Sequence, residues 1–204
     1  MADVCPVELP GRGCHAFAGS RDRQARIVQD LAEEIVRLND PRPFALFGHS
    51  LGAFICASLV DALTSRGRLP AYLFISAAVR PDLMEAEDDA RLQEVLLQEV
   101  AGPDGAGDAL ASLWSEALPL LRADLALVDR KARPELSLPV TVFSGTMDPI
   151  APPERVEAWR SLCSGPFAHQ SFAERHLYLR NRRDEILDTI DLSLGSVEVE
   201  APPY

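Results

Sequence analysis

The chain has 204 residues, of which 47% are hydrophobic and 25% are charged, so it can form one domain with a sizeable core. Its formal net charge of −11 repels phosphate backbones and anionic lipid surfaces, which makes nucleic-acid or membrane binding a poor explanation of its function. No signal peptide or bilayer-length apolar stretch is visible, and the four cysteines form no C-x-x-C pair, so we expect a cytoplasmic protein with reduced thiols.

Short apolar runs alternate with helical patterns along most of the chain. The runs predict strands over residues 4–9, 43–48, 69–76, 138–145 and 166–172. Pro6 weakens the first of these strands because proline has no N–H to donate. Apolar spacing predicts helices over residues 20–38, 51–65, 152–162 and 177–194. This alternation is typical of a mainly parallel α/β sheet covered by helices on both faces.

Residues 82–133 interrupt the alternation. They contain no strand pattern but helical ones, which the loop AGPDGAG at 101–107 separates. Open α/β sheets bind their ligands at the carboxyl ends of the strands. We therefore expect a single domain over residues 1–204 in which residues 82–133 form a helical lid over that edge of the sheet.

The motif Gly48-His49-Ser50-Leu51-Gly52 follows a predicted buried strand and opens a buried helix. In this context G-x-S-x-G is typical of a nucleophile elbow, where the serine lies on a cramped turn and the residues two positions to either side must be small. The serine hydroxyl then lies at a helix N-terminus, whose dipole favours an oxyanion. The alternative is a tight strand-to-helix turn without chemistry.

A nucleophilic serine needs a histidine base, which on this fold follows it in the chain. His176 comes after the last predicted strand and just before the last helix, so it can reach over the carboxyl edge of the sheet. His169 lies inside an apolar run and is interpreted as structural. His49 and His15 adjoin turns and are interpreted as packing or solvated residues.

The base in turn needs an acid that orients it. Asp148 directly follows the predicted strand 138–145, where a loop carboxylate can accept a hydrogen bond from an imidazole; its alternative role is to form an Asp-Pro turn. The end of the strand 69–76 is a rival position, but no carboxylate follows there until Asp82. The predicted catalytic residues are therefore Ser50, Asp148 and His176.

With these residues in place, the chain resembles the type II, or editing, thioesterases of polyketide and non-ribosomal peptide assembly lines, which have the α/β-hydrolase fold. The matching segments run in the same order over nearly the whole chain. They include LPGRG at 9–13, PFALFGHSLGA at 43–53, LPLLRADLALVD at 118–129, PVTVFSGTMDP at 139–149 and HLYL at 176–179. The resemblance assigns the family's triad to the same serine, aspartate and histidine.

Two departures from the family pattern affect what we expect. The family usually has a Gly-Gly pair just before the catalytic histidine, where this chain has Glu174 and Arg175, so the loop is expected to turn less tightly. The family also begins with a further strand and a loop that carries one of two oxyanion-hole amides, whereas Met1 stands where that region should have ended. We therefore expect an α/β-hydrolase fold that lacks the usual N-terminal strand, in a shortened version of a longer enzyme.

The resemblance implies hydrolysis of acyl thioesters on phosphopantetheinyl acyl or peptidyl carrier proteins, as editing or release during polyketide, non-ribosomal peptide or antibiotic biosynthesis. No cofactor or metal is implied. The Leu51 N–H would donate to the oxyanion. An acyl tunnel would be lined by Trp114, Leu118, Leu121 and Leu125, for which packing of the lid on the core is the alternative.

Carrier proteins tend to be acidic, so docking would need local positive charge. The candidates are the arginines around His176, with a solvated helix face as the alternative. They are Arg175, Arg180, Arg182 and Arg183. Two other functions stay open: a carboxylesterase or acyl-releasing hydrolase of primary metabolism, which would not prefer thioesters, and a non-catalytic carrier-protein-binding homologue, whose serine would not react with a fluorophosphonate.

Overall fold

A computed structural model describes residues 3–8, 24–101, 119, 122–123, 125–126, 128–131 and 134–196. Its centre is a sheet of parallel strands in the order β1-β2-β3-β4. The strands are β1 (Ala45–His49), β2 (Tyr72–Ser76), β3 (Val140–Gly145) and β4 (Phe167–Phe172). The strands β2, β3 and β4 lie within predicted strands, β1 extends one residue beyond the predicted end at residue 48, and the parallel arrangement is confirmed.

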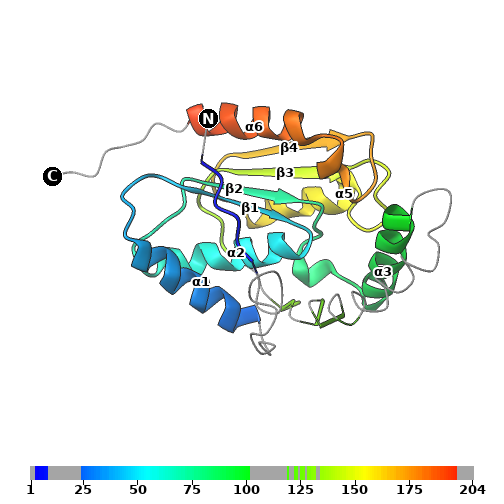
Figure 1. Cartoon of the computed structure of the whole chain (residues 1–204), viewed down its shortest axis with the longest axis horizontal. Coiled ribbons are helices and arrows are strands. Elements are labelled where there is room, and N and C mark those ends of the chain that lie inside the picture. The colour runs from blue at the N-terminus through cyan, green and yellow to red at the C-terminus, as the bar shows by residue number, and fades with distance from the viewer. Residues whose placement is uncertain are drawn as a thin grey trace.

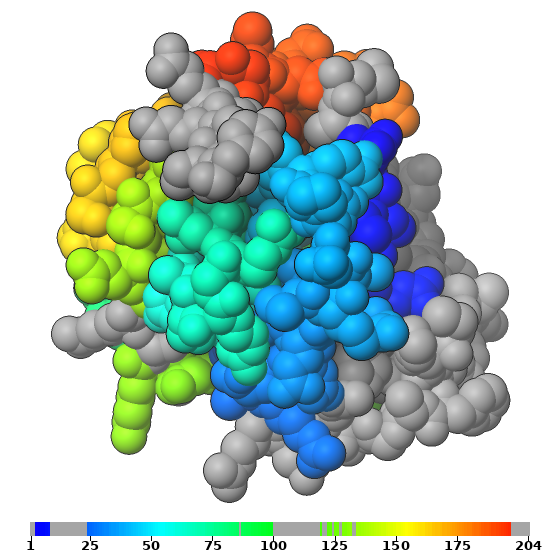
Figure 2. Space-filling model, turned by 90° about the vertical axis from the view of Figure 1, so that its left-hand side faces the viewer, coloured from blue at the N-terminus to red at the C-terminus, as the bar shows by residue number. Residues whose placement is uncertain are grey.

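Helices cover both faces of this sheet. The α-helices with both ends among the described residues are α1 (Gln24–Leu38), α2 (Leu51–Thr64), α3 (Ala86–Ala101), α5 (Pro153–Val156) and α6 (Arg183–Ser196). In Figure 1, α1 and α2 lie on one face, α6 lies on the other, and α3 lies beyond the carboxyl ends of the strands. Figure 2 shows the opposite end of the molecule, where the strands begin and α1 is seen in blue. None of the described helices combines the length and apolar character that a bilayer span requires.

The alternation of side chains along β2 divides the core into two layers. Leu73 and Ile75 pack with the buried faces of α1 and α2, whereas Tyr72 and Phe74 pack with residues that include Ile186 of α6. All five residues of β2 are buried, as expected for a central strand of a sheet that is covered on both faces. The two layers hold the strands rigidly, so the loops at their carboxyl ends have fixed positions.

The strand predicted over residues 4–9 is wrong for the part that the structure describes. Residues 3–8 form no helix or strand and are exposed, with Val4 at 80% and Val7 at 59%. Pro6 gives the physical reason, since it cannot donate to a ladder. Leu9 lies outside the described residues.

Two predicted helices are each divided into a tight 3₁₀ turn and an α-helix. Residues 152–162 form α5 followed by the 3₁₀ helix η3 (Glu157–Leu162), and residues 177–194 form η4 (Tyr178–Arg180) before α6. A buried aromatic lies in each 3₁₀ turn. The Trp159 indole N–H donates to the Ala78 carbonyl at 2.8 Å, and the Tyr178 hydroxyl lies 2.6 Å from Ser76 Oγ. These contacts with the end of β2 explain why each predicted helix is divided, which its apolar periodicity does not show.

The predicted lid is described only in part. It contains the 3₁₀ helix η2 (Pro81–Leu83) and α3, which confirms a helix where its first helical pattern lies. Most of the second pattern falls outside the described residues. The α3 side chains Leu92 and Val95 pack with Leu125 and Ile150, so this helix is fixed against the loop that follows β3. That the segment works as a lid stays a prediction.

Candidate active site

Ser50 lies on the turn between β1 and α2 in a strained conformation. Its φ of 53° is in the left-handed region, which a serine rarely adopts. Its N–H donates to the Ser76 carbonyl at 2.8 Å, which fixes the turn against the end of β2. Such strain concentrates at functional sites, where the surrounding structure maintains it.

The two glycines of the motif differ in what they permit. A Cβ on Gly48 would lie 2.3 Å from the Gly52 carbonyl oxygen, so position 48 must be glycine if the turn is to keep this shape. A Cβ on Gly52 itself would meet no atom of the described residues within 4 Å. The expectation that both positions must be small therefore holds at Gly48. It is wrong at Gly52, because the atom that crowds position 48 is the Gly52 carbonyl oxygen, which is present whatever the side chain at position 52.

The structure brings the three predicted catalytic side chains together at the carboxyl edge of the sheet. His176 Nε2 lies 3.2 Å from Ser50 Oγ, and His176 Nδ1 lies 2.7 Å from Asp148 Oδ2. Asp148 comes from the loop after β3 and His176 from the loop after β4, while Ser50 follows β1. With Nδ1 protonated, the imidazole donates to Asp148 and can accept the serine proton at Nε2.

Asp148 is buried yet kept charged. Burial by itself raises the pKa of Asp148, but hydrogen bonds from His176 and from the backbone N–H groups of Ile150 and Ala151 outweigh it, so the pKa lies below its usual value. The Ile150 and Ala151 N–H groups donate to Oδ1 at 2.9 and 3.2 Å, which leaves Oδ2 for the imidazole. The Asp-Pro turn and the orientation of the imidazole are therefore compatible roles of one side chain.

A second histidine lies against the first. The rings of His49 and His176 have centroids 5.3 Å apart, and His49 Nδ1 lies 2.9 Å from Ser76 Oγ, which in turn contacts Tyr178. Burial, together with repulsion from His176, lowers the pKa of His49 to about 3. His49 is thus a neutral, packed neighbour of His176, in agreement with the interpretation of it as a packing residue.

His169 lies elsewhere, in the middle of β4. Its Nε2 is 2.8 Å from Ser144 Oγ and its Nδ1 is 2.8 Å from Glu157 Oε2. Ser144 is completely buried in β3. These contacts hold β3, β4 and η3 together, as the structural interpretation of His169 predicts.

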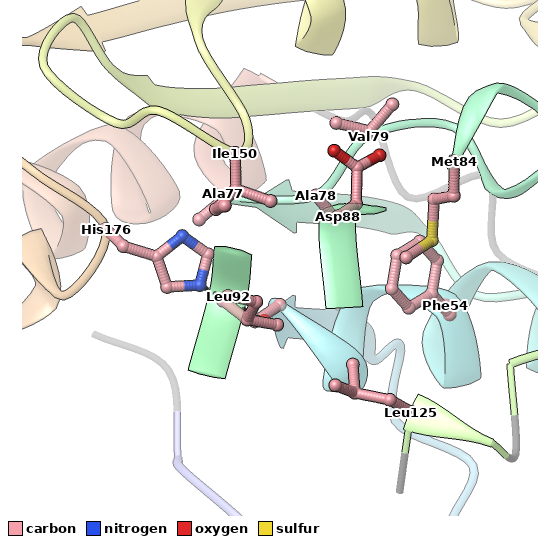
Figure 3. A pocket seen from close by; sticks show the side chains of 11 residues that line it. Phe54, Ala77, Ala78, Val79, Met84, Asp88, Leu92, Leu125, Ile150 and His176 are labelled. Carbon is pink, nitrogen blue, oxygen red and sulfur yellow. Dashed lines mark hydrogen bonds between the residues drawn. The ribbon is translucent and has the colours of Figure 1, made fainter. Parts of the chain in front are cut away.

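A small apolar pocket opens beside Ser50 and His176. Figure 3 shows His176 at one end, Phe54 and Met84 at the other, and Leu125 and Leu92 nearby. The polar lining residues are Ser50, His176 and Asp88. The apolar ones are Phe54, Ala77, Ala78, Val79, Met84, Leu92, Leu125 and Ile150. The predicted tunnel residues Trp114, Leu118 and Leu121 lie outside the described residues, whereas Leu125 does line the pocket.

Leu51 begins α2, directly after Ser50. The first N–H groups of a helix have no intrahelical partner and carry its positive dipole end. The Leu51 N–H is therefore suited to the predicted oxyanion contact. Among the described residues, no cluster of three or more histidine, cysteine or acidic side chains could hold a metal ion.

Comparison with known families decides the class of this site. A family model described as "Thioesterase domain" matches residues 1–194. The chain belongs to the thioesterase domain family. The expected resemblance to biosynthetic thioesterases is confirmed with it.

Individual relatives of this thioesterase support the same family assignment. It is 29% identical over 195 residues to the gramicidin S biosynthesis protein GrsT of Aneurinibacillus migulanus, covering 91% of this chain and 76% of that protein. It is 31% identical to the thioesterase PikA5 of Streptomyces venezuelae, covering 85% and 68%. The structure of the RedJ thioesterase from the prodiginine pathway of Streptomyces coelicolor matches with 34% identity and a TM-score of 0.78, covering 91% of this chain and 73% of that one. The expected α/β-hydrolase fold is thereby confirmed.

Glu174 and Arg175 precede His176, where the family pattern predicts a Gly-Gly pair. Glu174 accepts from Arg182 at 3.2 Å, and Arg175 lies 3.5 Å from Glu99. These two side chains point to partners outside the turn, so their bulk does not displace His176. His176 reaches both Ser50 and Asp148 with Glu174 and Arg175 in this loop. That the loop turns less tightly than in the family stays a prediction.

Three residues that contact the site were missed by the sequence analysis. Ser76 and Tyr178 connect to His49, and Glu99 of α3 accepts hydrogen bonds from the loop of His176. Each contact joins segments far apart in the chain, and no local pattern signals it. Only the position of Ser76 at the end of a predicted strand could have marked it as a candidate.

Proposed function

We propose that this thioesterase hydrolyses acyl thioesters carried by phosphopantetheinyl carrier proteins, with Ser50, His176 and Asp148 as its catalytic triad. The observation that carries the proposal is the hydrogen-bonded line from Ser50 through His176 to Asp148, which starts on a strained turn beside an apolar pocket. Membership of the thioesterase domain family supports the thioester as the bond that is cleaved.

The geometry supports an acyl-enzyme mechanism. Ser50 Oγ attacks the thioester carbonyl while His176 Nε2 takes the serine proton, and Asp148 stabilises the imidazolium that forms. Collapse of the tetrahedral intermediate breaks the C–S bond, and His176 returns the proton to the leaving thiolate. His176 then deprotonates a water that attacks the acyl-serine, and the carboxylic acid leaves with Ser50 restored.

The oxyanion of each tetrahedral intermediate needs hydrogen-bond donors. Leu51, at the start of α2, supplies one backbone N–H within this proposal. Loss of a single donor of this kind costs about 2.7–4 kcal/mol of transition-state stabilisation, so the position of this N–H governs the rate strongly.

The pocket suits an apolar acyl chain. Leu92, Leu125, Phe54 and Met84 all line it, and transfer of an acyl chain from water to these side chains is favourable. Trp114, Leu118 and Leu121 stay proposed members of an acyl tunnel together with Leu125. Substitution of Leu92 or Leu125 by a larger side chain is expected to shift the preference toward shorter acyl groups.

Carrier proteins are the proposed partners, because relatives of this chain are named for gramicidin S biosynthesis and the prodiginine pathway. The candidate docking arginines carry acidic neighbours: Arg182 contacts Glu185 at 2.8 Å and Arg183 contacts Asp184 at 3.1 Å. Their positive charge is thus partly balanced. The proposed cytoplasmic location is supported by Cys5, Cys56 and Cys163, which are free thiols.

Hydrolysis of acyl-pantetheine thioesters and of the matching oxygen esters, by the protein and its Ser50→Ala variant, tests the proposal. We expect turnover of the thioester that the substitution abolishes, with the oxygen ester hydrolysed more slowly. A preference for oxygen esters would instead indicate a carboxylesterase. Folded protein that neither turns over substrate nor reacts with a fluorophosphonate would indicate a binding homologue.

Docking is tested separately with the Arg183→Glu variant. If the arginines meet an acidic carrier protein, KM rises for the carrier-bound acyl group and not for acyl-pantetheine. An equal change for both substrates would contradict a docking role.

A further inference from the structure

The helix α3 lies across the carboxyl edge of the sheet, next to the loops that carry Asp148 and His176 (Figure 1). Its contacts with these loops are polar as well as apolar. They are made by two carboxylates, one near each end of the helix, at positions 88 and 99.

Glu99 contacts the loop of His176 through both carboxylate oxygens. The His176 N–H donates to Oε1 at 3.0 Å and the Leu177 N–H donates to Oε2 at 2.8 Å. The Glu99 side chain is only 11% exposed. The nearest guanidinium nitrogen, Arg175 Nε, is farther away at 3.5 Å. The carboxylate is therefore directed at two consecutive backbone donors, and one of these belongs to the catalytic histidine itself.

The other side of this loop rests on the segment that leads to Asp148. The Met147 N–H donates to the Glu174 carbonyl at 3.0 Å, and a Cβ on Gly145 would lie 2.5 Å from the same oxygen. That distance shows how closely the two loops approach. His176 thus lies in a loop that is held from one side by β3 and its extension and from the other by Glu99.

The opposite end of α3 is tied to the loop of Asp148. Arg155 donates to Asp88 at 2.9 and 2.8 Å, and its Nη1 also donates to the Ile150 carbonyl, two residues beyond Asp148, at 2.9 Å. The Asp88 side chain is 4% exposed. One helix therefore braces both loops of the triad.

We propose that Glu99 is a positioning residue for His176, whose loop it holds through two backbone hydrogen bonds. The position of α3 relative to the sheet then determines where the His176 imidazole lies with respect to Ser50 and Asp148. This inference rests on the proposed function and extends it to a residue of the predicted lid. A displacement of the base by about 1 Å is enough to cost about 100-fold in rate. The carboxylate acts on the position of the imidazole and does not contact the substrate.

The test compares Glu99→Ala and Glu99→Gln with Glu94→Ala, a control on the same helix. Glu94 is exposed and accepts a hydrogen bond only from Gln98 among the described residues. Two rates are measured for each folded protein: turnover of acyl-pantetheine and labelling of Ser50 by a fluorophosphonate. Thermal melting and circular dichroism establish that each variant is folded at the assay temperature.

We expect Glu99→Ala to lower kcat by about 10- to 100-fold with KM within twofold, and to slow fluorophosphonate labelling in parallel. Glu99→Gln should be intermediate, since its single carbonyl oxygen can replace one of the two acceptors. Glu94→Ala should match the unmodified protein. An equal kcat in Glu99→Ala, or a change confined to KM, would overturn the inference.

The two readouts separate this inference from the proposed function. Unmodified protein that is labelled but does not hydrolyse thioesters contradicts the proposed substrate, while the ratio of labelling rates still measures the effect of Glu99. Unmodified folded protein that is not labelled contradicts both, because His176 then has no reactive serine to position.

Discussion

Two groups of side chains in this protein have the composition Ser–His–carboxylate. We call them the pocket trio, which is Ser50, His176 and Asp148, and the strand trio, which is Ser144, His169 and Glu157. The serine-to-histidine distance is 3.2 Å in the pocket trio and 2.8 Å in the strand trio. The histidine-to-carboxylate distances are 2.7 and 2.8 Å. By distance alone the strand trio is the better hydrogen-bonded relay.

The surroundings of the two serines, in contrast, favour Ser50 over Ser144 as a nucleophile. Ser50 lines the pocket and precedes a helix N-terminus, so its hydroxyl meets both a space for substrate and backbone N–H donors. Ser144 is 0% exposed in the interior of β3 and also contacts Ser171 at 3.1 Å. A nucleophile therefore requires access and an oxyanion site as well as a base, and distances within a trio do not identify it.

Replacement of the two serines should give the largest contrast. Ser50→Ala removes the proposed nucleophile and is expected to lower kcat by about 10⁴- to 10⁶-fold. Ser144→Ala removes only the hydrogen bonds of Ser144 with His169 and Ser171, so it should cost about 1–3 kcal/mol of stability and leave kcat within twofold. Thioester turnover and thermal melting check both, and a comparable loss of turnover in Ser144→Ala would contradict the comparison.

The two carboxylates should differ nearly as much. Asp148→Asn keeps the shape of the pocket trio but favours the wrong imidazole tautomer, and kcat should fall by about 10³- to 10⁴-fold. Glu157 is 39% exposed at its side chain and its contact with His169 is open to water, so Glu157→Gln should leave kcat within about twofold. Steady-state kinetics on both variants provide the measurement.

The strained turn at Ser50 distinguishes this residue from Ser144, which lies within a strand, and substitutions of the glycines on either side of Ser50 disturb that turn. Gly48→Ala forces a Cβ against the Gly52 carbonyl at 2.3 Å, so we expect a loss of about 1–3 kcal/mol or more and a displaced Ser50. Gly52→Ala meets no described atom within 4 Å and replaces a helical glycine, so it should be neutral or stabilising by up to about 1 kcal/mol. Chemical denaturation distinguishes the two, and equal destabilisation would contradict the elbow geometry.

The last expected effect depends on pH and concerns His49, which lies against the histidine of the pocket trio. Its pKa of about 3 in the folded protein is below the ordinary value of 6.5, so between these pH values the unfolded chain binds a proton that the folded protein does not. Its contribution to stability is complete above pH 6.5 and is lost as the pH falls toward 3. The free energy of unfolding should thus fall with decreasing pH more steeply than in His49→Asn, by up to about 1.4 kcal/mol per pH unit. Parallel pH profiles would contradict a buried neutral His49.

Much of the pocket trio could be predicted from the sequence because each member follows a strand signal. Ser50 lies in a motif whose spacing reflects backbone crowding, and Asp148 and His176 directly follow apolar runs that end at one edge of the sheet. The strand trio could not be anticipated, since it depends on the register that pairs Ser144 with Ser171 and places His169 beside them. The same holds for Glu99, which meets a loop 77 residues away in the chain.

Local pattern also failed where tertiary contacts dominate. The predicted strand at residues 4–9 has a suitable composition, but its described part, residues 4–8, is exposed, contains Pro6 and forms no strand. Composition alone does not show this outcome. The predicted helices at 152–162 and 177–194 were found, but their subdivision depends on Trp159 and Tyr178 reaching the end of β2. Apolar periodicity reports which face of an element is buried and not which polar atom anchors it.

Labelling of the folded protein with a fluorophosphonate, followed by peptide mapping, tests the comparison most directly. If access and the elbow select the nucleophile, a single adduct forms on Ser50, labelling disappears in Ser50→Ala, and it is unchanged in Ser144→Ala. An adduct on Ser144, or labelling that survives in Ser50→Ala, would contradict the account.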